Sequence, residues 1–229
     1  MALRLISLKN WKGKPVPRLN LKKEPERQMI SESPLFWPAR MKGTELKVLD
    51  ETLLPEKISY IKIANIREAV NVIKQMKTRA FGQFLVVLNA FLLVLNQNRK
   101  TGDVVILKNI KDAAKLLNNS RPTFPFSEVT SIVVAWGESA LAQKVDLVPF
   151  VVKNITGYLS GIRGRRLDRI QKIADLLKNG DSVLTHCNVS GELAMAASIC
   201  RQRGKEIHFF ANETRPYMQG AKLTCWELK

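Results

Sequence analysis

The sequence predicts an α/β fold, in which an α-rich amino-terminal part precedes the first strand–helix–strand unit of a parallel sheet. Apolar residues recur with helical spacing through most of residues 66–177. Two short apolar runs, at 182–186 and 207–210, then flank a helical pattern over residues 192–203. Strand, helix and strand at this spacing form one βαβ unit of a parallel sheet.

A parallel sheet is normally covered on both faces and contains more than two strands. We therefore expect this unit to begin a Rossmann-like domain that is incomplete within the 229 residues. The remainder would be a removed carboxyl-terminal half or a second polypeptide. The expected division is a basic arm over residues 1–47, an α-rich domain over residues 48–153 and the start of the Rossmann-like domain over residues 154–229.

The first elements follow from composition and alternation. Residues 1–47 are rich in Lys, Arg and Pro with little periodicity, which indicates an arm with short extended pieces. Alternation at residues 60–63 predicts a strand, and the helical face beginning at Ile66 predicts a first helix with Asn65 as its N-cap. The apolar run over residues 84–95 is shorter than the roughly 20 residues of a membrane span, so it predicts a buried core helix.

The later helices are predicted in shorter pieces. One is expected at residues 111–117 and an apolar one at 127–141, followed by a helix or extended link at 145–153. Residues 166–177 are strongly amphipathic, and the pair Asn179-Gly180 is a suitable C-cap for that helix.

The formal net charge is +17, which raises the possibility of nucleic acid, an acidic membrane surface or anionic ligands as partners. Two clusters contribute, and the remaining charge is scattered. Because scattered charge is typical of a solvated basic surface and the sequence shows no nucleic-acid-binding motif, a nucleic-acid partner is not favoured. The two clusters are Arg4, Lys9, Lys12, Lys14, Arg18, Lys22, Lys23 and Arg27 in the arm, and Arg163, Arg165, Arg166 and Arg169.

The three cysteines form no CxxC pair, and no signal segment opens the sequence, so we expect a reducing cytoplasm. His186 and His208 are too isolated to form a metal-ligand cluster, so neither a metal nor a cofactor is expected. Cys200 and Cys225 fit the role of small buried hydrophobic residues.

Cys187 is the strongest candidate for chemistry. It follows a predicted strand and precedes Ser190-Gly191 at the start of the next helix. Unpaired N–H groups at a helix N-terminus favour the thiolate, although a buried structural cysteine is the alternative.

Polar residues after the second strand form the next candidate. Glu213 and Arg215 can bind a phosphorylated sugar, because Arg binds anionic oxygens and Glu accepts hydrogen bonds from hydroxyls. The alternative is a structural ion pair between them. Gln219 adds an amide, and Arg79 and Arg121 each lie beside backbone donors that suit a phosphate.

Four segments carry recognisable motifs: Met76-Lys77-Thr78-Arg79, Arg121-Pro122-Thr123, His186-Cys187-Asn188 and the ending Leu223-Thr224-Cys225-Trp226-Glu227-Leu228. Together they resemble the methylthioribose-1-phosphate isomerases, whose wider family includes ribose-1,5-bisphosphate isomerase and the regulatory subunits of translation initiation factor 2B. The resemblance runs from about residue 48 to residue 228. The first three segments depart from the family pattern in the residues that follow them, and the match over residues 213–228 is the strongest.

The resemblance implies an aldose–ketose isomerase of methionine salvage, which converts 5-methylthioribose 1-phosphate to 5-methylthioribulose 1-phosphate. It implies that Cys187 is the catalytic thiol and that Arg79, Arg121 and Gln219 contact the sugar phosphate. A catalytic aspartate would lie beyond Lys229, and a homodimer would form through the Rossmann-like domain. The alternatives are an isomerase of 5-deoxyribose 1-phosphate or ribose 1,5-bisphosphate, and a non-catalytic regulatory subunit like those of initiation factor 2B.

Overall fold

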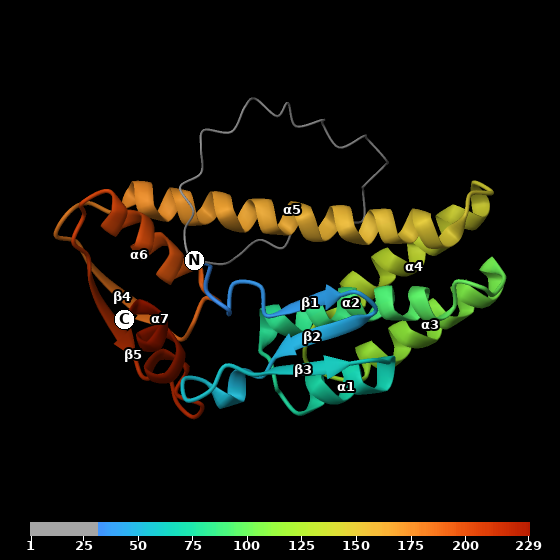
Figure 1. Ribbon diagram of the computed structural model, residues 1–229, viewed down its shortest axis with the longest axis horizontal. Coiled ribbons are helices and arrows are strands. Elements are labelled where there is room, and N and C mark those ends of the chain that lie inside the picture. The colour runs from blue at the N-terminus through green and yellow to red at the C-terminus, as the bar shows by residue number, and fades with distance from the viewer. Residues whose placement is uncertain (1–31) are drawn as a thin grey trace.

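The computed structural model describes residues 32–229, so most of the expected basic arm, including its cluster from Arg4 to Arg27, lies outside the described residues. An antiparallel sheet and four helices form one body, and a long helix, α5, leads from it to a small parallel sheet at the other end (Figure 1). The predicted α/β class, with a helical part before a βαβ unit, is confirmed.

The antiparallel sheet has the order β1–β2–β3, with β1 at Ala39–Lys42, β2 at Glu45–Leu49 and β3 at Tyr60–Ile63. Its inner face packs on α2, whereas its outer face carries charged residues. The predicted strand at residues 60–63 is confirmed. Residues 39–42 and 45–47, expected to be short extended pieces of an arm, are paired strands, so the sheet extends across the expected boundary at residue 47.

Helix α1 spans Ile66–Lys74 and begins as predicted, because the Asn65 side chain accepts a hydrogen bond from the Glu68 N–H at 3.0 Å. Helix α2 spans Ala80–Gln97 and forms the centre of the main core. By length and composition α2 is the one helix of the described residues that could cross a membrane, but 72% of it is buried within the fold. The predicted buried core helix is confirmed, although it is longer than the apolar run.

Helix α3 spans Asp103–Asn118, and α4 spans Phe126–Ala142, close to its predicted bounds. The prediction for α3 was too short. Val104 and Val105 lie in the first turn of α3 and are exposed. Because these two apolar residues are not on the buried face of the helix, they interrupt the helical pattern by which the sequence would reveal its start.

Helix α5 is continuous over Leu147–Leu176, whereas the sequence predicted two separate pieces. Glycines at positions 157, 161 and 164 lower helix propensity in its middle, but α5 packs against α4 at one end and α6 at the other. The predicted cap was also wrong. Helix α5 ends before Asn179-Gly180, and Gly180 forms a later turn in which its N–H donates to the Glu206 carbonyl at 2.8 Å.

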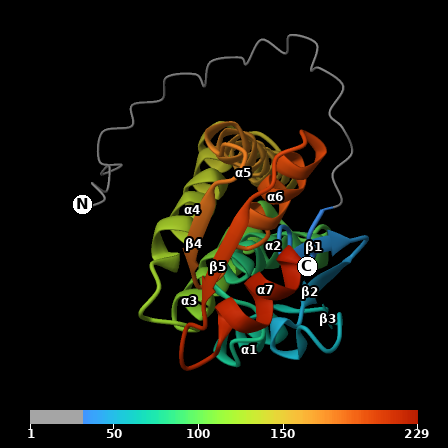
Figure 2. The ribbon, with the colours of Figure 1, turned by 90° about the vertical axis from the view of Figure 1, so that its left-hand side faces the viewer.

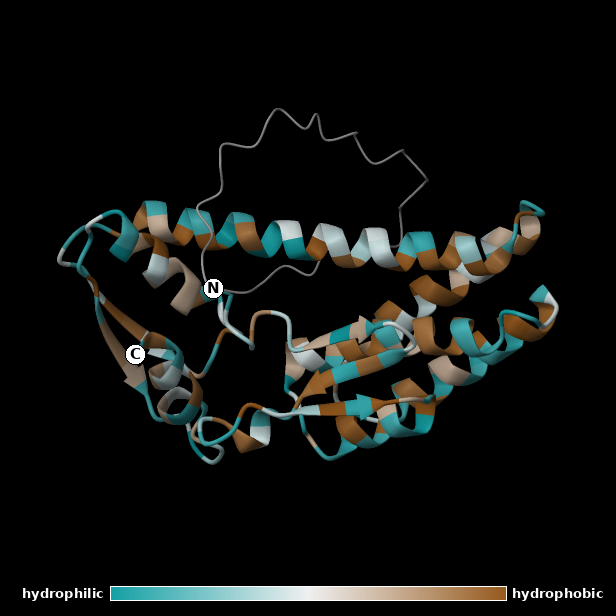
Figure 3. Cartoon of the chain, viewed as in Figure 1, coloured by the Kyte–Doolittle hydropathy of each residue, from teal (hydrophilic) through white to brown (hydrophobic). Residues whose placement is uncertain are grey.

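The βαβ unit is confirmed, with β4 at Ser182–His186, α6 at Glu192–Gln202 and β5 at His208–Asn212. The two strands are parallel. A second core, containing Phe36, lies mainly between α5 and α6. One face of the strand pair is open to solvent, as the view from that end shows (Figure 2), and part of this face is apolar (Figure 3).

Candidate functional site

A cleft of about 350 Å³ lies where the main body meets the chain that follows β5. One wall comes from the 3₁₀ helix Glu51–Leu53 and the turn between α1 and α2, and the other from residues after β5. Two of the predicted site residues, Arg79 and Gln219, line it together. The fold therefore brings these residues, 140 positions apart in the sequence, to one place.

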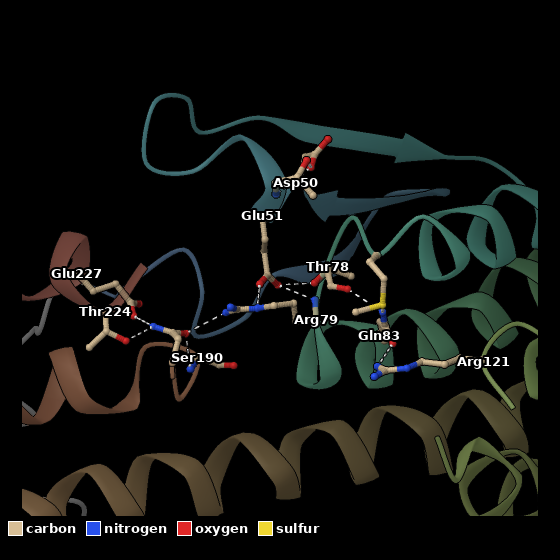
Figure 4. Close-up of polar contacts among 12 residues, drawn as sticks. Asp50, Glu51, Thr78, Arg79, Gln83, Arg121, Ser190, Thr224 and Glu227 are labelled. Atoms are coloured by element: carbon tan, nitrogen blue, oxygen red, sulfur yellow. Dashed lines mark hydrogen bonds and ion pairs between the residues drawn. The ribbon is translucent and has the colours of Figure 1, made fainter. Parts of the chain in front are cut away.

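Arg79 is the N-cap residue of α2, and its guanidinium is held from two sides (Figure 4). Its Nε donates to Glu51 Oε2 at 3.0 Å, and its Nη2 donates to Asn188 Oδ1 at 3.3 Å. Its Nη1 is buried and has no hydrogen-bond partner within residues 32–229. A buried donor without a partner is costly, so this atom is suited to an anionic ligand.

Gln219 supplies the complementary group. Its Oε1 is also buried without a partner within the described part of the chain. The next residue is Gly220, where a Cβ would lie 1.7 Å from the Asn212 carbonyl oxygen. Only glycine allows the π-helical turn Gly220–Thr224 to pack this closely on the end of β5, which places Gln219 in the cleft.

Glu51 is a residue of the cleft that the sequence did not identify. Its carboxylate is buried and accepts hydrogen bonds from the Thr78 hydroxyl, the Arg79 N–H and the Arg79 Nε. A buried carboxylate needs such partners. Glu51 therefore fixes the orientation of Arg79, and Figure 4 shows the two side chains in contact.

Arg121 does not line this cleft. Its Nη1 donates to Gln83 Oε1 at 2.8 Å, and its guanidinium lies 5.2 Å from the centre of the Phe124 ring. Gln83 in turn donates to the Thr78 carbonyl at 2.8 Å. Arg121 is thus connected to the Arg79 region through the buried Gln83, as Figure 4 shows, and its predicted role in binding phosphate stays a prediction.

Cys187 directly follows β4 and has a left-handed backbone conformation, with φ of 63°. Its N–H donates to Thr214 Oγ1 at 2.9 Å, and its carbonyl accepts a hydrogen bond from Thr224 Oγ1 at 2.6 Å. The thiol is half-buried, forms no disulfide, and lies a few residues before α6. Cys187 is not among the residues lining the cleft, but the turn that carries it is bonded to Arg79 through Asn188.

The carboxyl-terminal motif contributes a further carboxylate, the half-buried Glu227. It accepts hydrogen bonds from Ser33 Oγ and from Asn188 Nδ2, the latter at 2.6 Å. Burial raises the pKa of Glu227 above its usual value, although these hydrogen bonds oppose the rise. The sequence resemblance singled out this motif without giving Glu227 a role.

Glu213 and Arg215 form an exposed ion pair with Arg215 Nε 2.9 Å from Glu213 Oε2. This is the structural alternative considered from the sequence. Neither residue lines the cleft, and their predicted supporting role in ligand binding has no further support from the geometry.

Most residues of the second arginine cluster form ion pairs, with two carboxylates between them. Arg166 is buried between Glu192, at 3.1 Å, and the face of the Phe81 ring, at 3.7 Å, and burial lowers its pKa to about 10. Arg169 also pairs with Glu192, and Arg163 pairs with Glu32. Three of the four arginines therefore form ion pairs, and of these three only Arg166 is buried. Within residues 32–229 no three His, Cys, Asp or Glu residues form a potential metal site.

Comparison with known proteins gives a consistent result. The chain is 31% identical over 219 residues to the methylthioribose-1-phosphate isomerase of Desulforudis audaxviator, covering 85% of this chain and 57% of that protein. It is 33% identical over 207 residues to the enzyme of the same name from Thermosipho melanesiensis, covering 81% of this chain and 56% of that protein.

Solved structures share the fold. The crystal structure of translation initiation factor eIF-2B subunit delta from A. fulgidus matches with a TM-score of 0.68 and 28% identity, over 84% of this chain and 59% of that one. The 5-methylthioribose 1-phosphate isomerase of Pyrococcus horikoshii matches with a TM-score of 0.71 over 83% of this chain and 56% of that one, and at 21% identity it supports the fold alone.

The chain spans between 56% and 59% of the length of these four proteins. Residues 65–229 match the sequence pattern of a single family, described as the initiation factor 2 subunit family, and this match covers more than half of the chain. The resemblance seen in the sequence motifs is confirmed, and the chain belongs to the initiation factor 2 subunit family.

Proposed function

We propose that this chain carries the phosphate-binding residues and the thiol of a sugar-phosphate aldose–ketose isomerase, with 5-methylthioribose 1-phosphate as its substrate in methionine salvage. The observation that supports this most is that Arg79 and Gln219 line one cleft, and that each has a buried side-chain atom, Nη1 and Oε1 respectively, without a hydrogen-bond partner among residues 32–229. A sugar phosphate offers an anionic oxygen to the first and a hydroxyl to the second. The curated relatives at 31% and 33% identity bear the name of this isomerase.

The proposed reaction needs two proton-transferring groups. The C1 phosphate prevents spontaneous opening to an aldehyde. One group must therefore protonate the ring oxygen as its bond to C1 breaks, and another must take the proton from the C2 hydroxyl, while the C2 hydrogen ends on C1. The reaction needs neither a metal nor a redox cofactor. We assign one of the two roles to Cys187, whose thiol precedes the start of α6.

The second group would come from polypeptide beyond these 229 residues. The open face of the β4–β5 pair places Leu184 beside Phe210, and these side chains are 71% and 61% exposed. Parallel sheets bury such faces, and the matched relatives are longer than this chain. We propose that a segment equivalent to the rest of those relatives covers this face and supplies the catalytic aspartate, in the same polypeptide or in a second one.

Two further proposals concern the setting of the enzyme. The resemblance implies a homodimer joined through the parallel-sheet domain, which sedimentation of the completed protein tests. All three cysteines are free in the structure, and we propose a cytoplasmic location on that basis. Fractionation of cells that produce the protein tests the location.

A regulatory role like that of an initiation factor 2B subunit is the main alternative, because one matched structure carries that title. The isomerase and the regulatory subunit differ in whether they convert the sugar phosphate that they bind. A regulatory subunit would bind a sugar phosphate or nucleotide without converting it, whereas an isomerase converts 5-methylthioribose 1-phosphate to the ketose.

The decisive assay uses the completed protein with 5-methylthioribose 1-phosphate, 5-deoxyribose 1-phosphate and ribose 1,5-bisphosphate as separate substrates, and follows ketose formation. We expect the first substrate to give the highest kcat/KM and Cys187→Ala to abolish turnover. Cys225→Ala is the matched control and should retain turnover. Binding without conversion would support the regulatory function, and undiminished turnover in Cys187→Ala would remove Cys187 from the mechanism.

A further inference from the structure

Asn188 belongs to the turn that carries Cys187 and contacts Arg79, a residue that lines the cleft. Every hydrogen-bonding position of its side-chain amide is occupied. Its Oδ1 accepts from the Ser190 N–H at 2.9 Å and from Arg79 Nη2 at 3.3 Å. Its Nδ2 donates to Thr224 Oγ1 at 3.1 Å and to Glu227 Oε2 at 2.6 Å. A carboxamide has two donors and two acceptor lone pairs, so this one is fully used.

These partners allow only one orientation of the amide. The Ser190 N–H and the Arg79 guanidinium can only donate, and the Glu227 carboxylate accepts from the opposite side. Rotating the amide by 180° would place its NH₂ group against two donors and its oxygen against a carboxylate. This network is partly buried, and hydrogen-bond networks that are satisfied in one arrangement alone hold their members rigidly.

The network joins two parts of the chain that carry different functions. Arg79 belongs to the start of α2, and Asn188 belongs to the turn after β4. Glu51 and Asn188 together take up Arg79 Nε and Nη2, whereas Nη1 has no hydrogen-bond partner among residues 32–229. Asn188 therefore helps to determine which guanidinium nitrogen is available.

The turn itself requires support from outside. Cys187 and Ser190 have φ angles of 63° and 52°, which residues with a side chain rarely adopt. Such conformations persist where the surroundings over-determine them. Here Asn188 binds the Ser190 N–H, Arg166 Nη2 donates to the Ser190 carbonyl at 2.7 Å, and Thr224 links Asn188 to the Cys187 carbonyl.

We propose that Asn188 is a positioning residue that locks Arg79 and the Cys187 turn together, so that an anion bound to Arg79 is held at a fixed place relative to the thiol. The identity of that anion as a sugar phosphate rests on the proposed function. The coupling between Arg79 and the Cys187 turn does not rest on the proposed function. Experiments can therefore contradict the coupling without contradicting the proposed function, and the reverse.

The test measures the alkylation rate of each cysteine by iodoacetamide in the intact chain, with mass spectrometry of the peptides. Asn188→Ala should speed alkylation of Cys187 about five- to tenfold, because the turn loses its hydrogen bonds. Arg79→Ala should also speed the alkylation of Cys187. The double variant should react no faster than Asn188→Ala, since both changes break one network.

Two controls separate positioning from general damage. Cys200 is fully buried in the second core and should stay protected in every variant that keeps its fold. Asn71→Ala, on the exposed face of α1, should leave the Cys187 rate unchanged. If Cys200 becomes reactive in Asn188→Ala, that variant has lost its fold, and the test of the proposal then rests on the Cys187 rate in Arg79→Ala alone. An unchanged Cys187 rate in Arg79→Ala, or effects that multiply independently in the double variant, would overturn the proposal.

Calorimetric titration with inorganic phosphate addresses the ligand. We expect Asn188→Ala to weaken phosphate binding about fivefold or more and Asn71→Ala to leave it unchanged. Phosphate binding that is equal in wild type and Asn188→Ala would overturn the positioning role. Absence of phosphate binding in wild type would count against the proposed function, while the alkylation rates would still decide the coupling.

Discussion

The two sheets of this molecule each leave one face open, but the open faces differ in chemistry. In the antiparallel sheet, Arg40, Lys47 and Lys62 lie side by side on the outer face. In the parallel pair, Leu184 and Phe210 lie side by side and are exposed. Antiparallel sheets commonly face water on one side with polar residues, whereas parallel sheets are buried on both.

This difference indicates how each region gains its stability. The inner face of the antiparallel sheet contributes Ala39, Leu46, Val48 and Ile63 to the main core. By contrast, no residue of β4 or β5 is classed as buried in the structure of residues 32–229. The core beneath them is formed mostly by α5, α6 and Phe36. The first region is closed by its own side chains, and the second offers a surface for further polypeptide.

The largest expected effect is in the closed region. Phe91 is fully buried in α2, so Phe91→Ala should lower the free energy of unfolding by about 3–5 kcal/mol. Phe210→Ala is the matched change on the open face and should alter it by no more than ~0.5 kcal/mol. Urea denaturation followed by circular dichroism measures both. Equal losses would show that β5 is buried in solution.

The next effect concerns the ion pair between α5 and α6. Glu192→Ala leaves the buried Arg166 without its carboxylate partner, and we expect a loss of about 3 kcal/mol in the free energy of unfolding. Glu138→Ala removes an exposed pair with Lys111 and should cost less than ~1 kcal/mol. The same denaturation experiment decides, and a cost for Glu192→Ala no larger than that for Glu138→Ala would contradict the assigned role.

A smaller effect, visible as a pH dependence, is expected at Glu227. Burial raises its pKa in the native protein, so the native state binds more protons than the unfolded state between the ordinary and the raised pKa. Stability from this group is therefore greatest at low pH and decreases as pH rises through that window. Glu227→Gln removes the titration. The stability of wild type minus that of Glu227→Gln should fall as the pH rises from the ordinary pKa of a glutamate to the raised pKa of Glu227.

Denaturant unfolding of the two proteins at several pH values measures this difference. A difference that is independent of pH, or that increases with pH, would show that Glu227 is not desolvated in solution. Glu138→Gln makes the same substitution at an exposed position and is the matched control.

The smallest effect on the isolated chain is expected on the open face itself. Leu184 is 71% exposed, so Leu184→Ser should change the free energy of unfolding by no more than ~0.5 kcal/mol. The same variant should strongly weaken association with a polypeptide equivalent to the remaining part of the relatives. Lys62→Ser on the antiparallel sheet is the control and should not affect association. Copurification of the two polypeptides measures this, and equal recovery of both variants would contradict the proposed covering of β4 and β5.

The sequence predicted the elements whose periodicity is uninterrupted, including α2, β4 and the start of α1. It divided α5, because three glycines weaken the helical pattern where tertiary packing maintains the helix. It also placed β1 and part of β2 in the arm, because these strands directly follow a segment that is rich in Lys, Arg and Pro and has little periodicity.

The site was predicted in part. The motifs pointed to Arg79 and Gln219, and the fold brings both to one cleft. Glu51 and Asn188 were not assigned roles, because their importance depends on hydrogen bonds between segments far apart in the sequence. The available signals were the position of Asn188 directly after Cys187 and the position of Glu51 in a polar pair before a proline-containing turn. Sequence spacing alone does not show which polar residues will be buried together.

Hydrogen exchange followed by mass spectrometry tests the contrast between the closed and the open region most directly. In the isolated chain, amides of β4 and β5 should exchange at least ~10-fold faster than those of β2, because local opening is easier where few side chains are buried. Adding a polypeptide equivalent to the rest of the relatives should slow exchange in β4 and β5 and leave β2 unchanged. Equal protection of the two sheets in the isolated chain, with no change on addition, would contradict the account.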